Sequence, residues 1–173
     1  SLTWAANTIV PGHVASHFRA SRIVALSTGC VYPLVPVSSG GCREEDPVGP
    51  VGDYAMSCLG RERVFEHFSR LHGTKVCLIR LNYAVEPRYG VLADLARAVW
   101  KSEPIDISMG HVNVIGQGDA VERIIRSQDL CSSLPSILNL TGPETLSVRD
   151  LAGELGEMLG RKLETVNFDT AEL

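Results

Sequence analysis

Long apolar runs are missing from the 173-residue sequence. None approaches the roughly 20 consecutive apolar residues that a transmembrane helix needs. The N-terminal stretch SLTWAANTIV also lacks the charged-then-apolar order of a secretion signal. We therefore expect a cytoplasmic protein with no membrane partner.

Clustered positive charge is missing as well. The 16 lysines and arginines are scattered along the chain, and 20 acidic residues bring the formal net charge to −4. Proteins that bind nucleic acid gather lysine and arginine into a basic stripe that meets the phosphates. The charge pattern therefore argues against a nucleic-acid partner.

The cysteine pattern offers neither a disulfide framework nor a zinc site. Reduced thiols in a cytosol fit this pattern best. His13 and His17 lie one helical turn apart, which suits a metal, yet no third ligand has a sensible spacing, so we predict no metal site. The five cysteines are odd in number, widely spaced and never arranged as CxxC: Cys30, Cys42, Cys58, Cys77 and Cys131.

Apolar residues make up 45% of the sequence, which is ordinary for a globular protein with a buried core. Residues 22–28 and 75–81 are short, nearly continuous apolar runs, typical of strands covered on both faces of a parallel sheet. Between them, apolar residues at helical spacing predict a helix that Asp53 caps and Gly73 ends. This segment therefore predicts a strand-helix-strand crossover.

The rest of the chain continues the alternation of strands and helices. Cap signals at Asp119 and Ser147 precede two further helices. The alternation predicts an α/β fold with a mostly parallel sheet, built as one unit over residues 1–173. The further helices are expected at 90–102, 118–127 and 151–160, and the further strands at 112–115, 136–142 and 162–168.

Two hydroxyl groups are expected at one edge of this sheet. Thr28 stands at the carboxyl end of the first strand, and Tyr54 stands at the start of the following helix. Ligands of open α/β sheets bind at that edge. A phenol there can act as a general acid or base if a lysine ammonium one helical turn further along lowers its pKa.

Several motifs in order resemble those of extended short-chain dehydrogenases/reductases, the NAD-dependent epimerase/dehydratase family. They are LSTGCVYP, EEDP, DYAMSCLGRE, IRLN and ILNLTGPETLSVRDLAGELG. The resemblance implies a Rossmann-like, doubly wound parallel sheet with a small substrate domain. It also implies NAD or NADP as cofactor and a small-molecule substrate such as a nucleotide sugar or a similar polyol.

The resemblance also implies roles for single residues. Thr28 matches the residue that hydrogen-bonds the substrate oxygen, and Tyr54 matches the catalytic tyrosine. Tyr54, Cys58 and Asn82 occupy positions on the cofactor side of the site. Asp119 resembles an acidic residue of the family that we interpret as a helix cap.

Two departures from the family pattern bear on function. Cys58 stands where the family has its lysine, so no ammonium lowers the pKa of Tyr54; a nucleophilic thiol and a small buried hydrophobe are the alternatives for this cysteine. No Gly-rich turn of the GxGxxG type occurs, so the cofactor site is incomplete in this chain. We expect residues 1–173 to be the second half of a Rossmann domain with part of the substrate-binding region.

These departures leave two functions open. The chain is either part of an NAD(P)-dependent oxidoreductase or a non-catalytic module that senses a dinucleotide or binds a partner. An unpaired edge at residues 22–28 predicts self-association, and the family analogy suggests a homodimer. Arg80, Arg88 and Arg97 are candidates for contacts with a diphosphate, although Arg80 also suits a structural role at its strand end.

Overall fold

The computed structural model describes residues 1–162 and 165–166 of the chain. The chain forms two compact units. Unit 1 comprises residues 1–82 and 118–140, and unit 2 comprises residues 83–117 and 141–173. No helix among the described residues is long and apolar enough to span a membrane.

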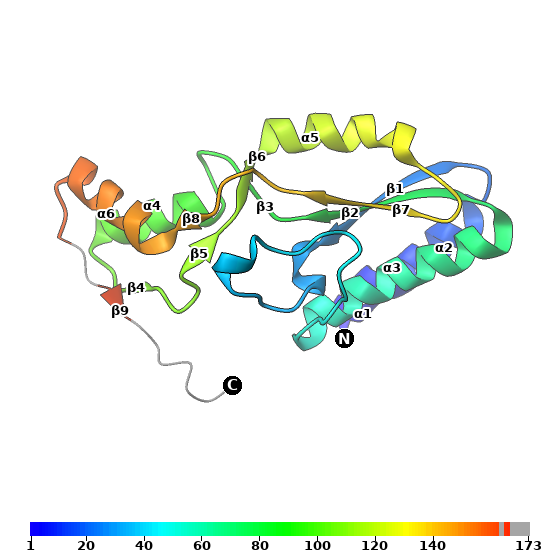
Figure 1. The fold of residues 1–173 in the computed structure, drawn as a ribbon, viewed down its shortest axis with the longest axis horizontal. Coiled ribbons are helices and arrows are strands. Elements are labelled where there is room, and N and C mark those ends of the chain that lie inside the picture. Colours follow the sequence, from blue (N-terminus) through cyan, green and yellow to red (C-terminus); the bar gives the residue numbers. More distant parts are fainter. Residues whose placement is uncertain (163–164, 167–173) are drawn as a thin grey trace. The chain divides into compact units, whose positions relative to one another are not determined.

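Unit 1 is built on a three-stranded parallel sheet with the order β1-β2-β7 (Figure 1). The strands are β1 (Arg22–Thr28), β2 (Lys75–Leu81) and β7 (Ser136–Leu140). Thr28 pairs with Leu81, and Leu81 pairs with Leu140, so the three carboxyl ends lie at one edge of the sheet. The predicted α/β fold with a parallel sheet is confirmed.

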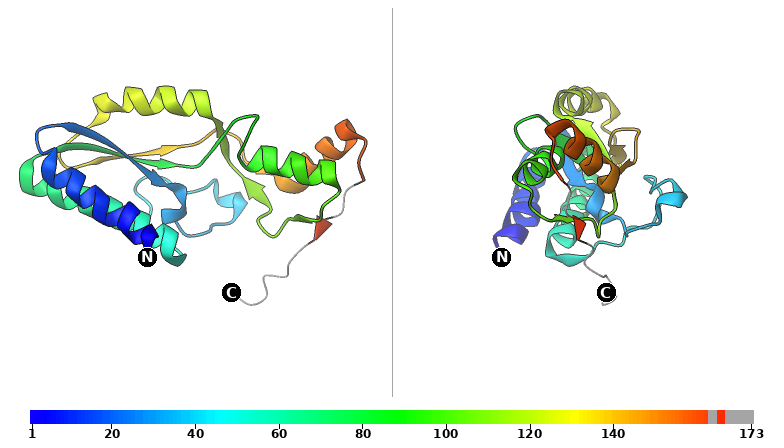
Figure 2. Two further views of the ribbon diagram at one scale, coloured as in Figure 1. Left: turned by 180° about the vertical axis from the view of Figure 1, so that it is seen from behind. Right: turned by 90° about the vertical axis from the view of Figure 1, so that its left-hand side faces the viewer.

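Helices cover both faces of this sheet, as Figures 1 and 2 show from opposite sides. Helices α2 (Val10–His17) and α3 (Gly52–His72) lie along one face, and α5 (Gln117–Arg126) lies along the other. A short helix α1 (Leu2–Trp4) and a π-helical turn (Ala5–Ile9) precede α2. The core on the α2 and α3 side consists of Ala15, Ala25, Phe65, Val76 and Leu78.

The ends of α3 test two predictions. Gly73 ends the helix in the left-handed conformation with φ 73°, as expected. The prediction that Asp53 caps the start is wrong, because the helix begins at Gly52 and Val51 is its N-cap residue. Asp53 lies in the first turn instead, where its negative charge still favours the helix dipole.

Unit 2 packs helices α4 (Val91–Lys101) and α6 (Val148–Leu159) over a core that includes Leu95, Val99 and Ala152. The Ser147 cap is confirmed, since its hydroxyl accepts a hydrogen bond from the Asp150 N–H at 3.2 Å. Among the residues that the structure describes, three two-stranded sheets complete the unit. They pair β3 (Tyr83–Val85) with β6 (Val114–Gly116), β4 (Ile105–Asp106) with β9 (Thr165–Val166), and β5 (His111–Val112) with β8 (Leu146–Ser147).

Two predicted strands are altered in unit 2. The single strand expected at 112–115 is divided between β5 and β6, which pair with different strands. The strand expected at 162–168 is described only at β9, and residues 163–164 and 167–168 lie outside the described residues. The short 3₁₀ turns of unit 1 are Gly29–Val31, Val37–Ser39 and Ser127–Leu130.

Candidate active site

The structure brings Thr28 and Tyr54 together at the carboxyl edge of the unit 1 sheet. Thr28 is the last residue of β1 and is only 8% exposed, whereas the Tyr54 side chain in the first turn of α3 is 56% exposed. The Thr28 hydroxyl lies near enough to the Tyr54 phenol to lower its pKa. A ligand at this edge can therefore reach both hydroxyl groups.

Thr28 also has a local structural role. Its Oγ1 accepts a hydrogen bond from the Cys30 N–H at 3.2 Å and so caps the Gly29–Val31 turn. A threonine hydroxyl has one proton to donate and two acceptor lone pairs. The cap uses one lone pair, and the proton remains for a ligand oxygen or for Tyr54.

Cys58 lies one helical turn after Tyr54 and is 1% exposed. Burial raises the pKa of the Cys58 thiol, against the opposing effect of the nearby Arg61. Burial also raises the pKa of Tyr54; the nearby Cys58 raises it further, and a hydrogen bond from Thr28 lowers it. The phenol is therefore protonated at neutral pH, which is the reverse of what a lysine at this position would cause.

Arg61 does not take the place of the missing lysine. Its guanidinium donates hydrogen bonds to the Leu26 carbonyl oxygen and to the Asn7 backbone and side chain. These contacts keep the Arg61 guanidinium next to β1 and the N-terminal helical segment. No hydrogen bond joins Arg61 to Tyr54 in the described part of the chain.

Asn82 directly follows β2 at the same edge of the sheet. Its backbone N–H donates to the Leu140 carbonyl oxygen at 2.9 Å. A Cβ atom added to Gly29 would lie 2.7 Å from the Asn82 Oδ1, so a larger residue there would force the Asn82 side chain to move. The close approach places Asn82 next to the turn that follows Thr28.

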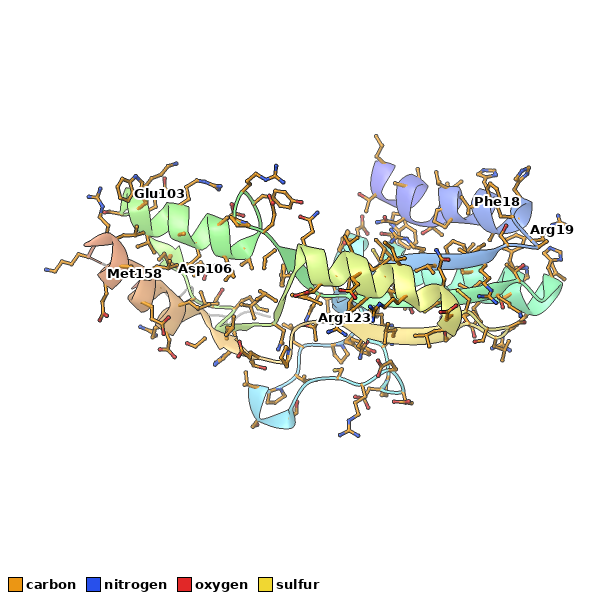
Figure 3. The ribbon with its side chains drawn as sticks, turned by 90° about the horizontal axis from the view of Figure 1, so that it is seen from above. Phe18, Arg19, Glu103, Asp106, Arg123 and Met158 are labelled. Atoms are coloured by element: carbon orange, nitrogen blue, oxygen red, sulfur yellow. The ribbon has the colours of Figure 1, made fainter. Side chains whose placement is uncertain are left out.

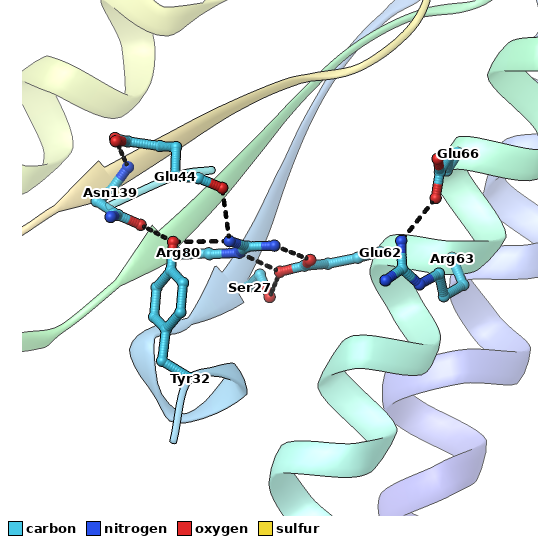
Figure 4. Close-up of polar contacts among 8 residues, drawn as sticks. All are labelled: Ser27, Tyr32, Glu44, Glu62, Arg63, Glu66, Arg80 and Asn139. Atoms are coloured by element: carbon cyan, nitrogen blue, oxygen red, sulfur yellow. Dashed lines mark hydrogen bonds and ion pairs between the residues drawn. The ribbon is translucent and has the colours of Figure 1, made fainter. Parts of the chain in front are cut away.

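A buried polar network extends from this edge, and Figure 4 shows its members. Arg80 donates to both carboxylate oxygens of Glu62, at 3.1 and 2.8 Å, and to the Tyr32 hydroxyl at 2.6 Å. The Ser27 hydroxyl donates to Glu62 at 2.5 Å. Arg80 therefore has the structural role rather than the diphosphate role, because its donors are occupied inside the protein.

The network also anchors the long loop after Tyr32. The Tyr32 hydroxyl donates to the Asn139 Oδ1 at 2.8 Å, and the Asn139 N–H donates to the Glu44 carboxylate at 2.7 Å. The Asn139 side-chain amide donates to the Cys42 carbonyl oxygen at 3.1 Å. Glu44 is therefore more than a solvated loop residue, because its carboxylate binds the backbone of β7.

Sequence reasoning missed Glu62, although one signal was present. Tyr54, Cys58 and Glu62 follow each other at intervals of four residues, so they share one face of α3. A carboxylate on the face that packs against the sheet needs a partner there, because an unpaired buried charge is strongly unfavourable. Arg80 on the neighbouring strand is that partner.

The other two candidate arginines belong to unit 2 and pair with acidic neighbours on its surface. Arg88 contacts the Glu86 carboxylate at 2.9 Å, and Arg97 contacts the Asp94 carboxylate at 2.6 Å. In residues 1–162 and 165–166, no group of three or more His, Cys, Asp or Glu side chains is arranged to hold a metal ion.

Comparison with protein families identifies the family of this chain. The model of the NAD dependent epimerase/dehydratase family matches residues 1–139. This chain belongs to the NAD-dependent epimerase/dehydratase family. Among curated proteins, no sequence matches it.

Solved structures show the same fold at low sequence identity. RMD from Pseudomonas aeruginosa complexed with NADPH has a TM-score of 0.76 at 17% identity, over 95% of this chain and 62% of that one. UDP-glucose 4-epimerase from Thermus thermophilus complexed with NAD has a TM-score of 0.75 at 21% identity, over 96% of this chain and 59% of that one. dTDP-glucose 4,6-dehydratase from Bacillus anthracis in complex with NAD has a TM-score of 0.81 at 15% identity, over 95% of this chain and 56% of that one. The family member described here thus spans between half and two thirds of each structure.

Proposed function

We propose that residues 1–173 form the second half of an NAD(P)-binding Rossmann domain together with part of the substrate-binding region of an oxidoreductase. The observation that carries this proposal is the placement of the Tyr54 phenol beside the Thr28 hydroxyl at the carboxyl edge of a parallel sheet. In this proposal Thr28 orients a substrate oxygen and Tyr54 exchanges a proton with it.

The residues at this edge fit one end of the cofactor. NAD(P), when bound, supplies or accepts a hydride. Tyr54 and Asn82 would line the nicotinamide end, and Cys58 would contribute packing because its buried thiol carries no charge. The sequence contains no Gly-rich turn to hold a pyrophosphate, so we propose that the pyrophosphate is held outside these residues.

The raised pKa of Tyr54 determines which form of the phenol meets the substrate at neutral pH. A protonated phenol can give its proton to an oxygen that gains negative charge as a carbonyl is reduced. The reverse step needs a phenolate, and the surroundings of Tyr54 disfavour that form. We therefore propose that Tyr54 acts as a general acid in a reduction.

The substrate class is proposed by analogy with structural neighbours. MoeE5 was solved in complex with UDP-glucose and NAD, with 20% identity and a TM-score of 0.76 to this chain. We propose a sugar nucleotide or a similar polyol as substrate. A hydroxyl group of either would suit the Thr28 and Tyr54 pair.

A second candidate function is a non-catalytic module that senses a dinucleotide or binds a partner. Cys58 favours this alternative, because a neutral thiol cannot lower the pKa of Tyr54 as a lysine would. The same fold and the same hydroxyl groups would then serve binding alone.

Variants of the full-length parent protein test the two functions. For an enzyme, Tyr54→Phe should lower kcat by about 10²-fold to 10⁴-fold, because it removes the general acid. Turnover is followed by nicotinamide absorbance, and dinucleotide affinity is measured by calorimetry. The sensing module would be favoured if the wild type binds a dinucleotide without turnover and if Tyr54→Phe leaves the dinucleotide affinity unchanged. A large gain in turnover from Cys58→Lys would indicate an enzyme that has lost activity.

A further inference from the structure

Unit 2 contains a cavity of its own. Its volume is about 320 Å³, and its walls come from α4, from residues 104–112 and from the start of α6. Small-molecule sites typically have volumes of about 300 to 1,000 Å³ and mostly apolar walls. The cavity is therefore large enough for a ligand group.

The walls of this cavity are mainly apolar. Leu95 and Ile105, which are both buried in the unit 2 core, form part of them. Ala98 and Leu151 continue the wall along the two helices. The described lining includes 14 residues. Tyr83, Asp94, Asp106 and His111 carry polar side-chain groups, and none of the 14 is a lysine or arginine. An apolar group would gain free energy by leaving water for this cavity.

The charges at the cavity are negative. The Asp94 carboxylate is paired with Arg97 at 2.6 Å, and the Asp106 Oδ1 accepts a hydrogen bond from the Ser108 N–H at 2.8 Å. That hydrogen bond lowers the pKa of Asp106, so its carboxylate is ionised at neutral pH. Figure 3 shows Asp106 next to the ribbons of α4 and α6. Arg97 offsets the charge of Asp94, so a phosphate at the cavity would meet mainly the negative charge of the exposed Asp106 carboxylate.

We propose that the unit 2 cavity binds an uncharged, mostly apolar group. The volume and the mainly apolar lining favour such a group, and the Asp106 carboxylate disfavours an anion such as a diphosphate. The proposal concerns unit 2 alone, and it stands whether or not the proposed oxidoreductase function is correct. If the chain does act on a sugar nucleotide, the charged diphosphate lies elsewhere.

Two fluorescent probes with the same ring system test this proposal on the 173-residue chain. N-phenyl-1-naphthylamine is neutral, and 1-anilinonaphthalene-8-sulfonate carries one negative charge. We expect the neutral probe to bind one site per chain at least tenfold more tightly than the anionic probe. Ala98→Phe should fill the cavity and abolish binding of the neutral probe, with far-UV circular dichroism confirming the fold.

A second variant, which reverses the charge of Asp106, tests the proposal even if Ala98→Phe fails to fold. Asp106 is solvent-exposed, so Asp106→Lys should preserve the fold. This variant should bind the anionic probe about tenfold more tightly, because the repulsion becomes an attraction. Its affinity for the neutral probe should stay within twofold of the wild-type value. Asp129→Lys is the matched control, since Asp129 is 90% exposed in unit 1 and should change neither affinity.

Three results would overturn the proposal. They are equal or tighter binding of the anionic probe by the wild type, neutral-probe binding that a folded Ala98→Phe retains, and no effect of Asp106→Lys on the anionic probe. Failure of the proposed function would look different. Loss of turnover in a Tyr54→Phe parent changes no probe affinity, because Tyr54 belongs to unit 1.

Discussion

The Glu62 carboxylate accepts hydrogen bonds from the Nε and Nη2 atoms of Arg80 at 3.1 and 2.8 Å, and the two side chains are 3% and 4% exposed. The pair joins α3, which carries Tyr54, to β2 in the middle of the sheet. Ser27 and Tyr32 bind the remaining polar atoms of the pair. Such complete hydrogen bonding offsets the cost of removing two charges from water.

Removing one member of this pair should destabilise the chain strongly. Arg80→Met leaves the Glu62 carboxylate buried without its cation, which typically costs about 3 to 5 kcal/mol. The free energy of unfolding is measured by urea denaturation. Arg70→Met is the control, because Arg70 pairs with Glu66 at 2.7 Å while 59% exposed, and its loss should cost about 0 to 1 kcal/mol. Equal effects of both variants would contradict the structural role of Arg80.

The contact between Glu44 and Asn139 should hold the loop after Tyr32 in place. Glu44→Ala removes the acceptor of the Asn139 N–H, so thermolysin should cut sooner near the exposed Leu34 and Val37. Glu44→Gln retains an acceptor oxygen and should restore much of the protection. Glu45→Ala is the control, since Glu45 is exposed; equal cleavage in all variants would rule out this anchor.

Restoring the family's lysine should change the acidity of Tyr54. In Cys58→Lys an ammonium replaces the buried thiol, and its charge favours the phenolate, so the pKa of Tyr54 should lie below that of the wild type. Spectroscopic titration of the four tyrosines, with Tyr54→Phe to assign the signal, measures this. Met56→Lys adds the same charge at an exposed position of α3. An identical effect of both lysines would show that general charge, not position, is responsible.

The outer edge of β1 should promote self-association. β1 pairs only with β2 among the described residues, and Leu26 on β1 is 43% exposed. Unpaired edge strands pair with other chains, and lysine on an edge opposes this. We expect the wild type to elute as more than a monomer in size-exclusion chromatography, and Leu26→Lys to shift it toward monomer. Leu71→Lys on α3, where Leu71 is 60% exposed, is the control. A wild-type monomer at moderate concentration would contradict the prediction.

Glu66 should make stability depend on pH. Hydrogen bonding from Arg70, and then from Arg63, lowers the pKa of Glu66 below its ordinary value of 4.5. Because the folded pKa is lower than the unfolded one, this stabilisation is present above pH 4.5 and is lost as pH falls through the folded pKa. Glu66→Gln should cost about 0.5 to 1 kcal/mol at pH 7. Urea midpoints should converge with those of the wild type in acid, and a constant difference would contradict the assignment.

Local sequence patterns were enough to predict the three strands of the unit 1 sheet and the helices α3, α4, α5 and α6. The strands β1 and β2 are short apolar runs, which a parallel sheet covered on both faces requires. Gly73 and Ser147 marked helix ends because their conformational and hydrogen-bonding preferences act within one turn. The start of α3 was misplaced by two positions, because the predicted N-cap residue was Asp53 and the observed one is Val51.

The candidate site could be predicted only in part. Thr28 and Tyr54 follow from the end of a strand and the start of a helix. The buried contacts of Glu62 and Glu44 could not be predicted, because their partners lie 18 and 95 positions away in the chain. Whether a carboxylate is solvated or buried depends on such distant partners.

The order of five short motifs, two of which contain Thr28, Tyr54 and Cys58, is a property of the sequence, and it was sufficient to suggest the family and the edge of the sheet where ligands bind. Tertiary structure was needed to show that the Cys58 thiol is 1% exposed and that the pKa of Tyr54 is raised. It also decided that the chain forms two units, one of which has a cavity lined by apolar and acidic residues. Burial and electrostatic environment arise from groups that only folding brings together.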